Sequence, residues 1–142
     1  SVLFRRIARA WGLARTGKQI RETLGSLVPG HLSSTRECDT WFYWPAGIDP
    51  STWDAFRVAG EGNAESKRLL EEICLEEIGN LALFILAEHG ATTTEDLARS
   101  VCRLLGITRT TNDAEARVRR AIAHGRAFEL VKTENGTVSG VH

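Results

Sequence analysis

The sequence predicts a mostly helical α+β fold built from two copies of one helical unit, and a repeat within the chain is the main reason. Residues 3–16 (LFRRIARAWGLART) align without a gap to residues 97–110 (LARSVCRLLGITRT). The identical aligned pairs include Arg9 with Arg103, Gly12 with Gly106, and Arg15 with Arg109. Self-similarity at a fixed offset indicates a duplicated structural unit. A β-hairpin pattern follows each copy, which adds strands to the helices.

The composition is that of an ordinary globular protein. The 142 residues are 42% apolar and 25% charged, which fits one or two small domains. No apolar run is long enough for a membrane helix, so no membrane partner is expected. The three cysteines are widely spaced and odd in number, which favours a reducing, cytoplasmic location over a disulfide framework. The chain starts at Ser1 and contains no methionine, so we expect a fragment of a longer protein.

In the first copy, apolar periodicity predicts a helix over residues 2–11 that ends at Gly12. Residues 16–19 (TGKQ) have the form of a capping box and open a second helix, which stops before Pro29. Two helices joined by a short turn that contains glycine are typical of a helix-turn-helix.

Two short strands, residues 31–36 and 40–44, are predicted next, because these residues favour β structure. The aromatic run at residues 41–44 (WFYW) is expected mainly in the core, with stacking on nucleic-acid bases as the alternative. The domain organisation predicted along the chain is a first unit with its connector, an acidic linker and a second unit, at residues 1–58, 59–72 and 73–142.

The second copy has an additional helix in front of it, predicted over residues 75–88. Either Thr93 or Thr94 caps the next helix, which ends at Gly106, and Asn112 caps a third helix. Strands over residues 127–133 and 137–141 follow, around the strong hairpin signal Asn135-Gly136.

This order of elements is that of a winged helix, in which a β-hairpin wing follows a helix-turn-helix. We therefore predict tandem winged-helix-like units. The first of these lacks its leading helix, which we expect before Ser1.

Basic side chains on the recognition helices are the candidates for nucleic-acid binding, because such a helix lies in the major groove. In the second copy, Val118 and Ile122 face inward by helical geometry, which points Arg120 and His124 outward. The candidate nucleic-acid-binding residues on the recognition helices and the second wing are Arg117, Arg119, Arg120, His124, Lys18, Arg21 and Lys132.

The residues that recur in both copies are expected to be structural. They are Arg9, Arg15, Arg103, Arg109, Gly12 and Gly106. Arg15 and Arg109 each lie just before a helix cap, where they can bridge to acids such as Glu76 and Glu77. Contact with phosphates is the alternative for these two arginines.

No catalytic motif is found. Residues 16–18 (TGK) lack the frame of a phosphate-binding P-loop. The four histidines and three cysteines lack zinc-site spacing. The glutamates of residues 71–77 form a run, which we expect to be solvated, because a metal site needs converging ligands. We expect no catalysis, metal or cofactor in this fragment.

Four segments carry a resemblance to a known family: residues 5–17 (RRIARAWGLARTG), 44–45 (WP), 73–78 (ICLEEI) and 103–109 (RLLGITR). They resemble the C-terminal domain of unknown function of large bacterial superfamily-1 helicase-like proteins. In those proteins the domain follows an ATPase core and a restriction-endonuclease-like domain. The resemblance implies a parent enzyme that uses ATP and magnesium on nucleic acid. The family often has prolines after the position of Ile73, where this chain has Cys74 and Leu75.

The expected function is therefore a non-catalytic nucleic-acid-binding domain, with DNA and other domains of the parent protein as partners. The alternative is a module for protein–protein interaction or self-association, including a weak homodimer, since fold does not determine function.

Overall fold

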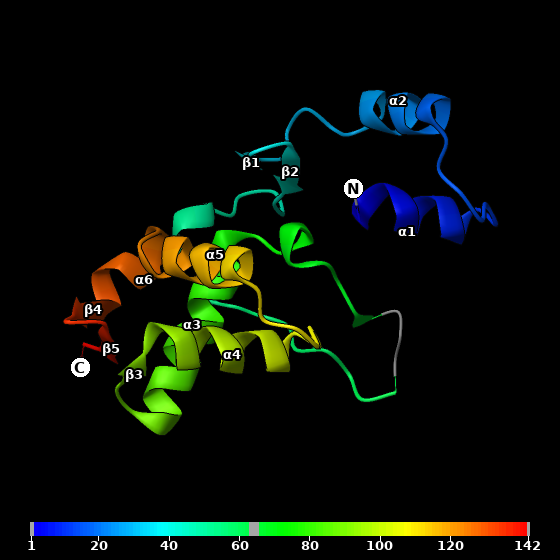
Figure 1. The fold of residues 1–142 in the computed structure, drawn as a ribbon. Helices are drawn as coiled ribbons and strands as arrows, with labels where there is room; N and C mark the ends of the chain where they lie inside the picture. Colours follow the sequence, from blue (N-terminus) through cyan, green and yellow to red (C-terminus); the bar gives the residue numbers. More distant parts are fainter. Residues whose placement is uncertain (1, 63–65, 142) are drawn as a thin grey trace. The chain divides into compact units, whose positions relative to one another are not determined.

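The computed structural model describes residues 2–62 and 66–141 and divides the chain into two compact units (Figure 1). Unit 1 is Ser1–Asp49 and unit 2 is Pro50–His142. Each unit contains helices and a small antiparallel sheet, so the fold is α+β. The boundary expected at Val58 falls inside unit 2, and so does the segment expected to be an acidic linker.

Unit 1 consists of two helices followed by a hairpin. Its elements are α1 (Val2–Ala10), α2 (Lys18–Ser26), β1 (Ser34–Glu37) and β2 (Thr40–Tyr43). The two strands pair antiparallel with Glu37 opposite Thr40, and Cys38 in the turn has a φ of 51°. The order of elements matches the prediction, but α2 follows Gly17 without a side-chain cap. The capping box expected at Thr16 is therefore wrong.

A glycine in the left-handed conformation ends α1. Gly12 has a φ of 76°, and its N–H donates to the Arg9 carbonyl over 2.9 Å. The N–H of Leu13 donates to the Ala8 carbonyl over 2.8 Å. These bonds satisfy carbonyl groups that have no partner within the helix. Residues with a Cβ rarely adopt this conformation, which explains the glycine.

The repeated segment builds the same helix end in unit 2. Gly106 has a φ of 73°, and its N–H donates to the Arg103 carbonyl over 3.1 Å. The N–H of Ile107 donates to the Cys102 carbonyl over 2.9 Å. Donors and acceptors occupy the same positions of the repeat as in unit 1. The sequence repeat thus corresponds to a repeated local structure.

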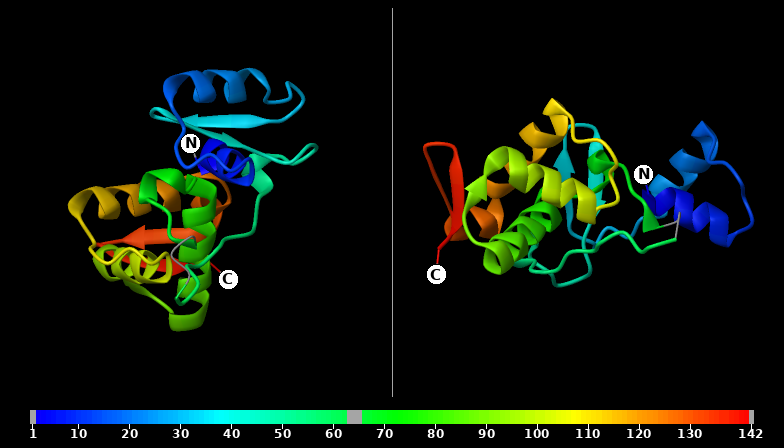
Figure 2. Two further views of the ribbon diagram at one scale, coloured as in Figure 1. Left: turned by 90° about the vertical axis from the view of Figure 1, so that its right-hand side faces the viewer. Right: turned by 60° about the horizontal axis from the view of Figure 1, so that its bottom comes forward.

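Unit 2 combines four helices with a three-stranded sheet in its described residues (Figures 1 and 2). Its elements are α3 (Leu75–His89), β3 (Thr92–Thr93), α4 (Thr94–Leu104), α5 (Asn112–Ile122), α6 (Gly125–Leu130), β4 (Val131–Glu134), β5 (Thr137–Gly140) and the 3-10 helices η1 (Pro50–Thr52) and η3 (Leu70–Glu72). The strand order is β3-β5-β4, and both pairings are antiparallel. α2 and α5 begin at matching positions of the repeat.

The caps of the two helices that follow α3 are threonines. Thr93 caps α4 by accepting a hydrogen bond from the Asp96 N–H over 3.1 Å. Thr111 caps α5 by accepting from the Ala114 N–H over 3.2 Å, so the cap predicted at Asn112 lies one position too late. Capping of this kind satisfies an N–H group that the helix itself leaves without a partner.

Helix α6 replaces the start of a predicted strand. Residues 127–130 were expected to be extended, but the strand begins only at Val131. Ala127 is 3% exposed, and a Cβ placed on Gly79 of α3 would lie 2.9 Å from its Cβ. The helical turn therefore packs closely on α3 at a position where both partners are small. Tertiary packing of this kind overrides local β propensity.

The hydrophobic core of unit 2 is built around α3, which packs against α4, α5, α6 and β5. The largest fully buried side chains of this cluster are Ile73, Ile78, Leu81, Leu97, Val101, Val118 and Val138. Burial of this apolar surface is the main favourable contribution to folding. Within residues 2–62 and 66–141, no helix is long and apolar enough to cross a membrane.

The irregular segment that precedes α3 is held to the core by polar side chains. Asn80 of α3 is 4% exposed, and its Nδ2 donates to the carbonyls of Trp53 and Ala55 over 2.7 and 3.3 Å. Backbone groups outside helices and strands need such partners when they are buried. Residues 53–55 are thus held in a defined position against α3.

Glu77 provides the strongest of these attachments. Its carboxylate accepts hydrogen bonds from the Arg68 guanidinium at 2.7 and 2.8 Å and from the Arg57 guanidinium and N–H at 2.9–3.3 Å. The Glu77 and Arg68 side chains are 5% and 7% exposed. Burial alone would raise the pKa of Glu77, but the hydrogen bonds and charges of the two arginines outweigh it and lower the pKa below 4.5. The expectation that this glutamate is solvated is wrong.

We expect Glu77→Ala to lower the free energy of unfolding by about 3–5 kcal/mol, because the buried Arg68 loses its counter-ion. Glu88→Ala removes an exposed carboxylate from the same helix and should cost less than about 0.5 kcal/mol. Urea unfolding of the two variants and the parent chain measures both values. Equal losses would mean that the buried ion pair does not stabilise unit 2.

The lowered pKa of Glu77 predicts a loss of stability in acid. Its contribution is complete above the unfolded pKa of about 4.5 and disappears as the pH falls through the lower folded pKa. The difference in unfolding free energy between the parent chain and Glu77→Gln should therefore shrink on acidification. Urea titrations from neutral pH to about pH 3 would detect this. A difference that stays constant over this range contradicts the assignment.

Candidate nucleic-acid interface

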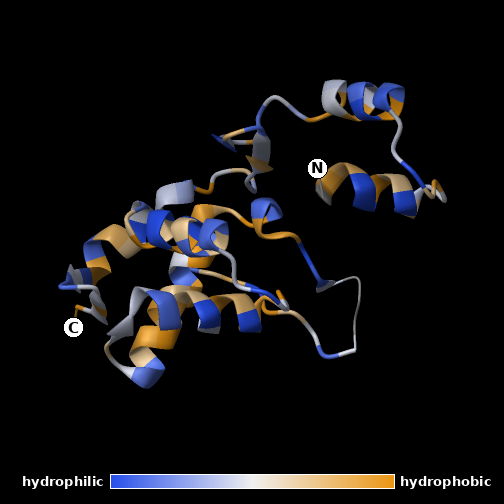
Figure 3. Ribbon diagram, in the orientation of Figure 1, coloured by the Kyte–Doolittle hydropathy of each residue, from blue (hydrophilic) through white to orange (hydrophobic). Residues whose placement is uncertain are grey.

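Helix α5 presents one apolar and one polar face. Ala114, Val118 and Ala121 are buried in the core, whereas Ala116 and Arg120 are exposed on the opposite side. Figure 3 shows hydrophilic and apolar residues alternating along α5. This is the orientation that the spacing of the apolar residues predicts.

Arg117 does not belong to the outer face. It is 7% exposed, its Nε donates to the Leu70 carbonyl over 3.0 Å, and its Nη2 donates to the Ile73 carbonyl over 2.6 Å. The prediction that Arg117 is available to nucleic acid is wrong. The apolar pattern alone did not reveal this, because the carbonyls that bind Arg117 lie far away in the sequence.

Two further predicted residues have acidic partners within the chain. Arg119 is exposed but lies 2.7 Å from the Glu115 carboxylate. His124 Nε2 lies 2.9 Å from Glu76 Oε1. Binding of either side chain to a phosphate would compete with these contacts.

Arg120 is different, because it is exposed and forms no ion pair with any residue that the structure describes. Arg126 on α6 and Lys132 on β4 share both properties. These three side chains come from consecutive elements, and α6 packs against both α5 and β4. We call Arg120, Arg126 and Lys132 the basic set of unit 2. Arg126 was not among the predicted contact residues, although its charge is evident in the sequence.

The repeated arginines do not form the predicted bridges. Arg15 and Arg109 are exposed and make no ion pair within residues 2–62 and 66–141. Glu76 lies beside His124, and Glu77 forms ion pairs with Arg57 and Arg68. The structural role proposed for Arg15 and Arg109 is therefore not supported by contacts.

Unit 1 offers weaker candidates. Lys18 lies 3.9 Å from Glu22, and both side chains are largely exposed, so this pair contributes little to stability. Arg21 is exposed and has no ion pair among the described residues. The aromatic run divides between two environments. Trp44 is 5% exposed and its Nε1 donates to Thr35 Oγ1 over 3.0 Å, whereas Trp41 is 48% exposed.

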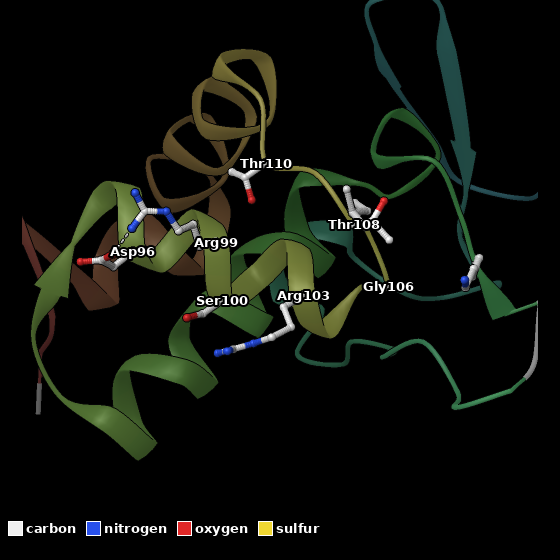
Figure 4. Close-up of a pocket in the computed structure, with 9 residues that line it drawn as sticks. Asp96, Arg99, Ser100, Arg103, Gly106, Thr108 and Thr110 are labelled. Atoms are coloured by element: carbon white, nitrogen blue, oxygen red, sulfur yellow. Dashed lines mark hydrogen bonds and ion pairs between the residues drawn. The ribbon is translucent and has the colours of Figure 1, made fainter.

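A hollow of about 650 Å³ lies beside the C-terminal half of α4 (Figure 4). Its lining includes Arg99, Ser100, Arg103 and Lys67. Figure 4 shows Arg99 directed at Asp96, with which it forms an ion pair. Arg103 and Lys67 are exposed and lack an acidic partner among the described residues. The hollow is therefore net basic, but one of its cations is already neutralised.

The repeated glycine, Gly106, lines this hollow and packs closely against Ala59. A Cβ on Gly106 would lie 2.7 Å from the Cβ of Ala59, and the Ala59 N–H donates to the Leu104 carbonyl over 2.9 Å. Glycine is thus required at position 106 for two reasons: the positive φ and the close contact with Ala59. Gly12, its counterpart, has nothing within 4 Å of such a Cβ.

No group of three or more metal-binding side chains occurs in the described parts of the chain. Cys74 and Cys102 are buried and Cys38 is exposed, and none of the three forms a disulfide. Burial raises the pKa of the Cys102 thiol above 9.0, in spite of a hydrogen bond with Thr110 that acts in the opposite direction. A thiol of this kind is chemically inert at neutral pH.

Arg117 and Arg120 should differ in their effect on stability. Arg117→Leu removes the donor from the buried Ile73 carbonyl and from the partly buried Leu70 carbonyl and should lower the unfolding free energy by about 1–3 kcal/mol. Arg120→Leu removes only an exposed cation and should change it by less than about 0.5 kcal/mol. Urea unfolding of both variants tests this, and an unchanged stability of Arg117→Leu would contradict the buried role.

The comparisons with known proteins give one short match. No curated protein and no solved structure matches the chain. Residues 1–22, which contain α1 and the start of α2, match the model of a protein family of unknown function, DUF3320.

Proposed function

We propose that this chain is a non-catalytic DNA-binding module in which unit 2 is a winged helix and α5 is its recognition helix. The order of elements in unit 2 supports the proposal: helix, short strand, three helices, of which the last (α6) is short, and a hairpin whose second strand pairs with the short strand. In a helix-turn-helix the second helix of the pair enters the major groove. In unit 2 that helix is α5, and the β4–β5 hairpin forms the wing.

The basic set of unit 2 is the observation that carries this proposal. Arg120, Arg126 and Lys132 are exposed cations on α5, α6 and the wing. No described acid neutralises them, so they are available to phosphate groups. Lysine and arginine contacts to phosphates supply most of the sequence-independent affinity for DNA. We assign these residues to the DNA backbone, where they would position α5 in the groove.

Unit 1 has a secondary role in this proposal. Helix α2 of unit 1 corresponds to α5 of unit 2. On α2, Lys18 is paired with Glu22, which leaves Arg21 as the cation of this helix without an ion pair among the described residues. The affinity of the chain for DNA therefore resides mainly in unit 2.

The proposed setting is a larger ATP-dependent, helicase-related enzyme of bacteria, as the resemblance of residues 5–17, 73–78 and 103–109 implies. The parent motor would bind ATP and magnesium, and this chain would hold the nucleic acid. The first 22 residues match a family of unknown function.

An electrophoretic mobility assay of the full chain with duplex and branched DNA at low salt tests the proposal. We expect a shift at micromolar protein, with an affinity that falls steeply as salt rises. Arg120→Glu should weaken binding to all sequences alike and reduce the slope of log affinity against log salt by about one, because one phosphate contact is lost.

Arg103→Glu is the matched control, since it makes the same change of charge on α4. It should weaken binding by less than about twofold, the effect expected from net charge alone. No shift with any form of DNA would overturn the proposed function. Equal losses in the two variants would overturn the assignment of α5 as the contact helix.

A further inference from the structure

The hollow beside α4 has a size and a charge that suit a small anion. Lys67, Arg99 and Arg103 line it together with one acid, Asp96, which leaves two positive charges in excess. Its volume of about 650 Å³ lies within the range of about 300–1,000 Å³ that is typical of small-molecule sites. A concave surface with an excess of one charge concentrates small ions of the opposite sign.

Three of the lining residues are neighbours on the surface of α4. Arg103 follows Arg99 by four positions and Ser100 by three, and residues at these spacings lie next to each other on a helix. Figure 4 shows the side chain of Arg103 beside Ser100. Two guanidinium groups and a hydroxyl group can therefore reach the same anion.

These donors are available to a ligand. Arg103 has no acidic partner and Ser100 no hydrogen-bond partner for its hydroxyl among the residues that the structure describes. Arg99 forms ion pairs with Glu95 and Asp96, but all three side chains are more than half exposed. Exposed pairs of this kind contribute little to stability, so an anion can replace the two carboxylates at Arg99.

The repeat retains both arginines of this helix face. Arg99 and Arg103 correspond to Arg5 and Arg9 of the first copy, although all four are exposed and packing does not restrict them. By contrast, the buried position of Val101 is occupied by a different apolar residue in the first copy, a change that a core tolerates. The identity of the two arginines therefore points to binding rather than to packing.

We propose that the hollow binds a small phosphorylated molecule through a phosphate monoester group. Arg99, Ser100 and Arg103 hold the phosphate, and the rest of the molecule extends along the hollow toward Ile107 and Lys67. Arginine suits this ligand, because its paired N–H groups match the geometry of phosphate oxygens. The site is separate from the proposed DNA contact, which uses the basic set of unit 2, and it does not depend on that contact.

Charge favours a monoester over the phosphodiester of a nucleic-acid backbone. A phosphate monoester carries a charge of about −1.5 to −2 at neutral pH, which matches the two positive charges that the lining has in excess. Each phosphodiester of DNA carries a single negative charge. A free phosphorylated molecule therefore fits the hollow better than a segment of DNA backbone does.

The site is complete in unit 2 only. The first copy of the repeat has Arg6 in place of Ser100 and Ala14 in place of Thr108, so both hydroxyl groups of the lining are missing there. We therefore expect each chain to bind one phosphate at such a site.

A pair of small probes tests the proposal. Methyl phosphate is a monoester and dimethyl phosphate a diester, and each is titrated into the isotope-labelled full chain at about pH 7.5, where the monoester is a dianion, and at constant ionic strength. Backbone amide shifts measured by NMR report the site and the affinity. We expect methyl phosphate to cause saturable shifts centred on residues 99–108, with a dissociation constant at least about tenfold lower than that of dimethyl phosphate, since the diester has lost one charge.

Two outcomes of these titrations would overturn the proposal. The absence of saturable shifts with methyl phosphate would mean that the hollow does not bind phosphate monoesters. Equal affinities for the two probes would mean that the hollow accepts a backbone-type phosphodiester, which contradicts the assignment to a small phosphorylated molecule.

Single substitutions locate the phosphate. Arg99→Gln and Arg103→Gln should each raise the dissociation constant of methyl phosphate by about tenfold, the loss expected for one charge-assisted hydrogen bond. Arg109→Gln is the matched control, because it removes an exposed cation beside Thr108 that does not line the hollow, and it should change the constant by less than about twofold. The amide spectrum of each variant also shows whether the fold is retained. Equal effects of all three substitutions would overturn the assignment of this helix face.

Discussion

The buried carboxylate of Glu77 is the interaction on which the architecture of unit 2 depends. An ionised group with 5% exposure is tolerated only when it is paired and hydrogen-bonded. Arg68 and Arg57 supply those bonds from a segment without regular structure. Asn80 and Arg117 bind carbonyls of the same segment. Since irregular backbone must find partners outside itself, these polar side chains fix residues 53–57 and 68–73 against α3 and α5.

The same physical reasoning separates two groups of cations that look alike in the sequence. One group points inward and completes hydrogen bonds, as Arg68 and Arg117 do. The other group is exposed and has no acid to pair with among the described residues, as in Arg120. The first group stabilises the fold, and the second is the basis of the proposed DNA contact. Only the positions of distant carbonyls and carboxylates distinguish the two.

The two copies of the repeat share the same local structure but differ in their surroundings. Both copies end a helix at a left-handed glycine with the same pattern of hydrogen bonds, which involves residues within one turn. The surroundings of the two copies differ. α3 covers the apolar face of the second copy, whereas the corresponding side chains of the first, such as Trp11, face solvent. The same hydrogen-bonded helix end therefore occurs beside a closed core in unit 2 and beside exposed apolar side chains in unit 1.

The sequence by itself determined the α+β class, the order of helices and hairpins, the glycine helix ends and the orientation of α5, because these depend on short-range periodicity and on turn chemistry. The tertiary structure decided the unit boundary after Asp49, the helical state of residues 125–130 and the burial of Glu77 and Arg117. It also showed that Arg109 lacks the predicted acidic partner. Each of these depends on contacts between residues far apart in the chain, and such contacts leave no periodic signal in a single sequence.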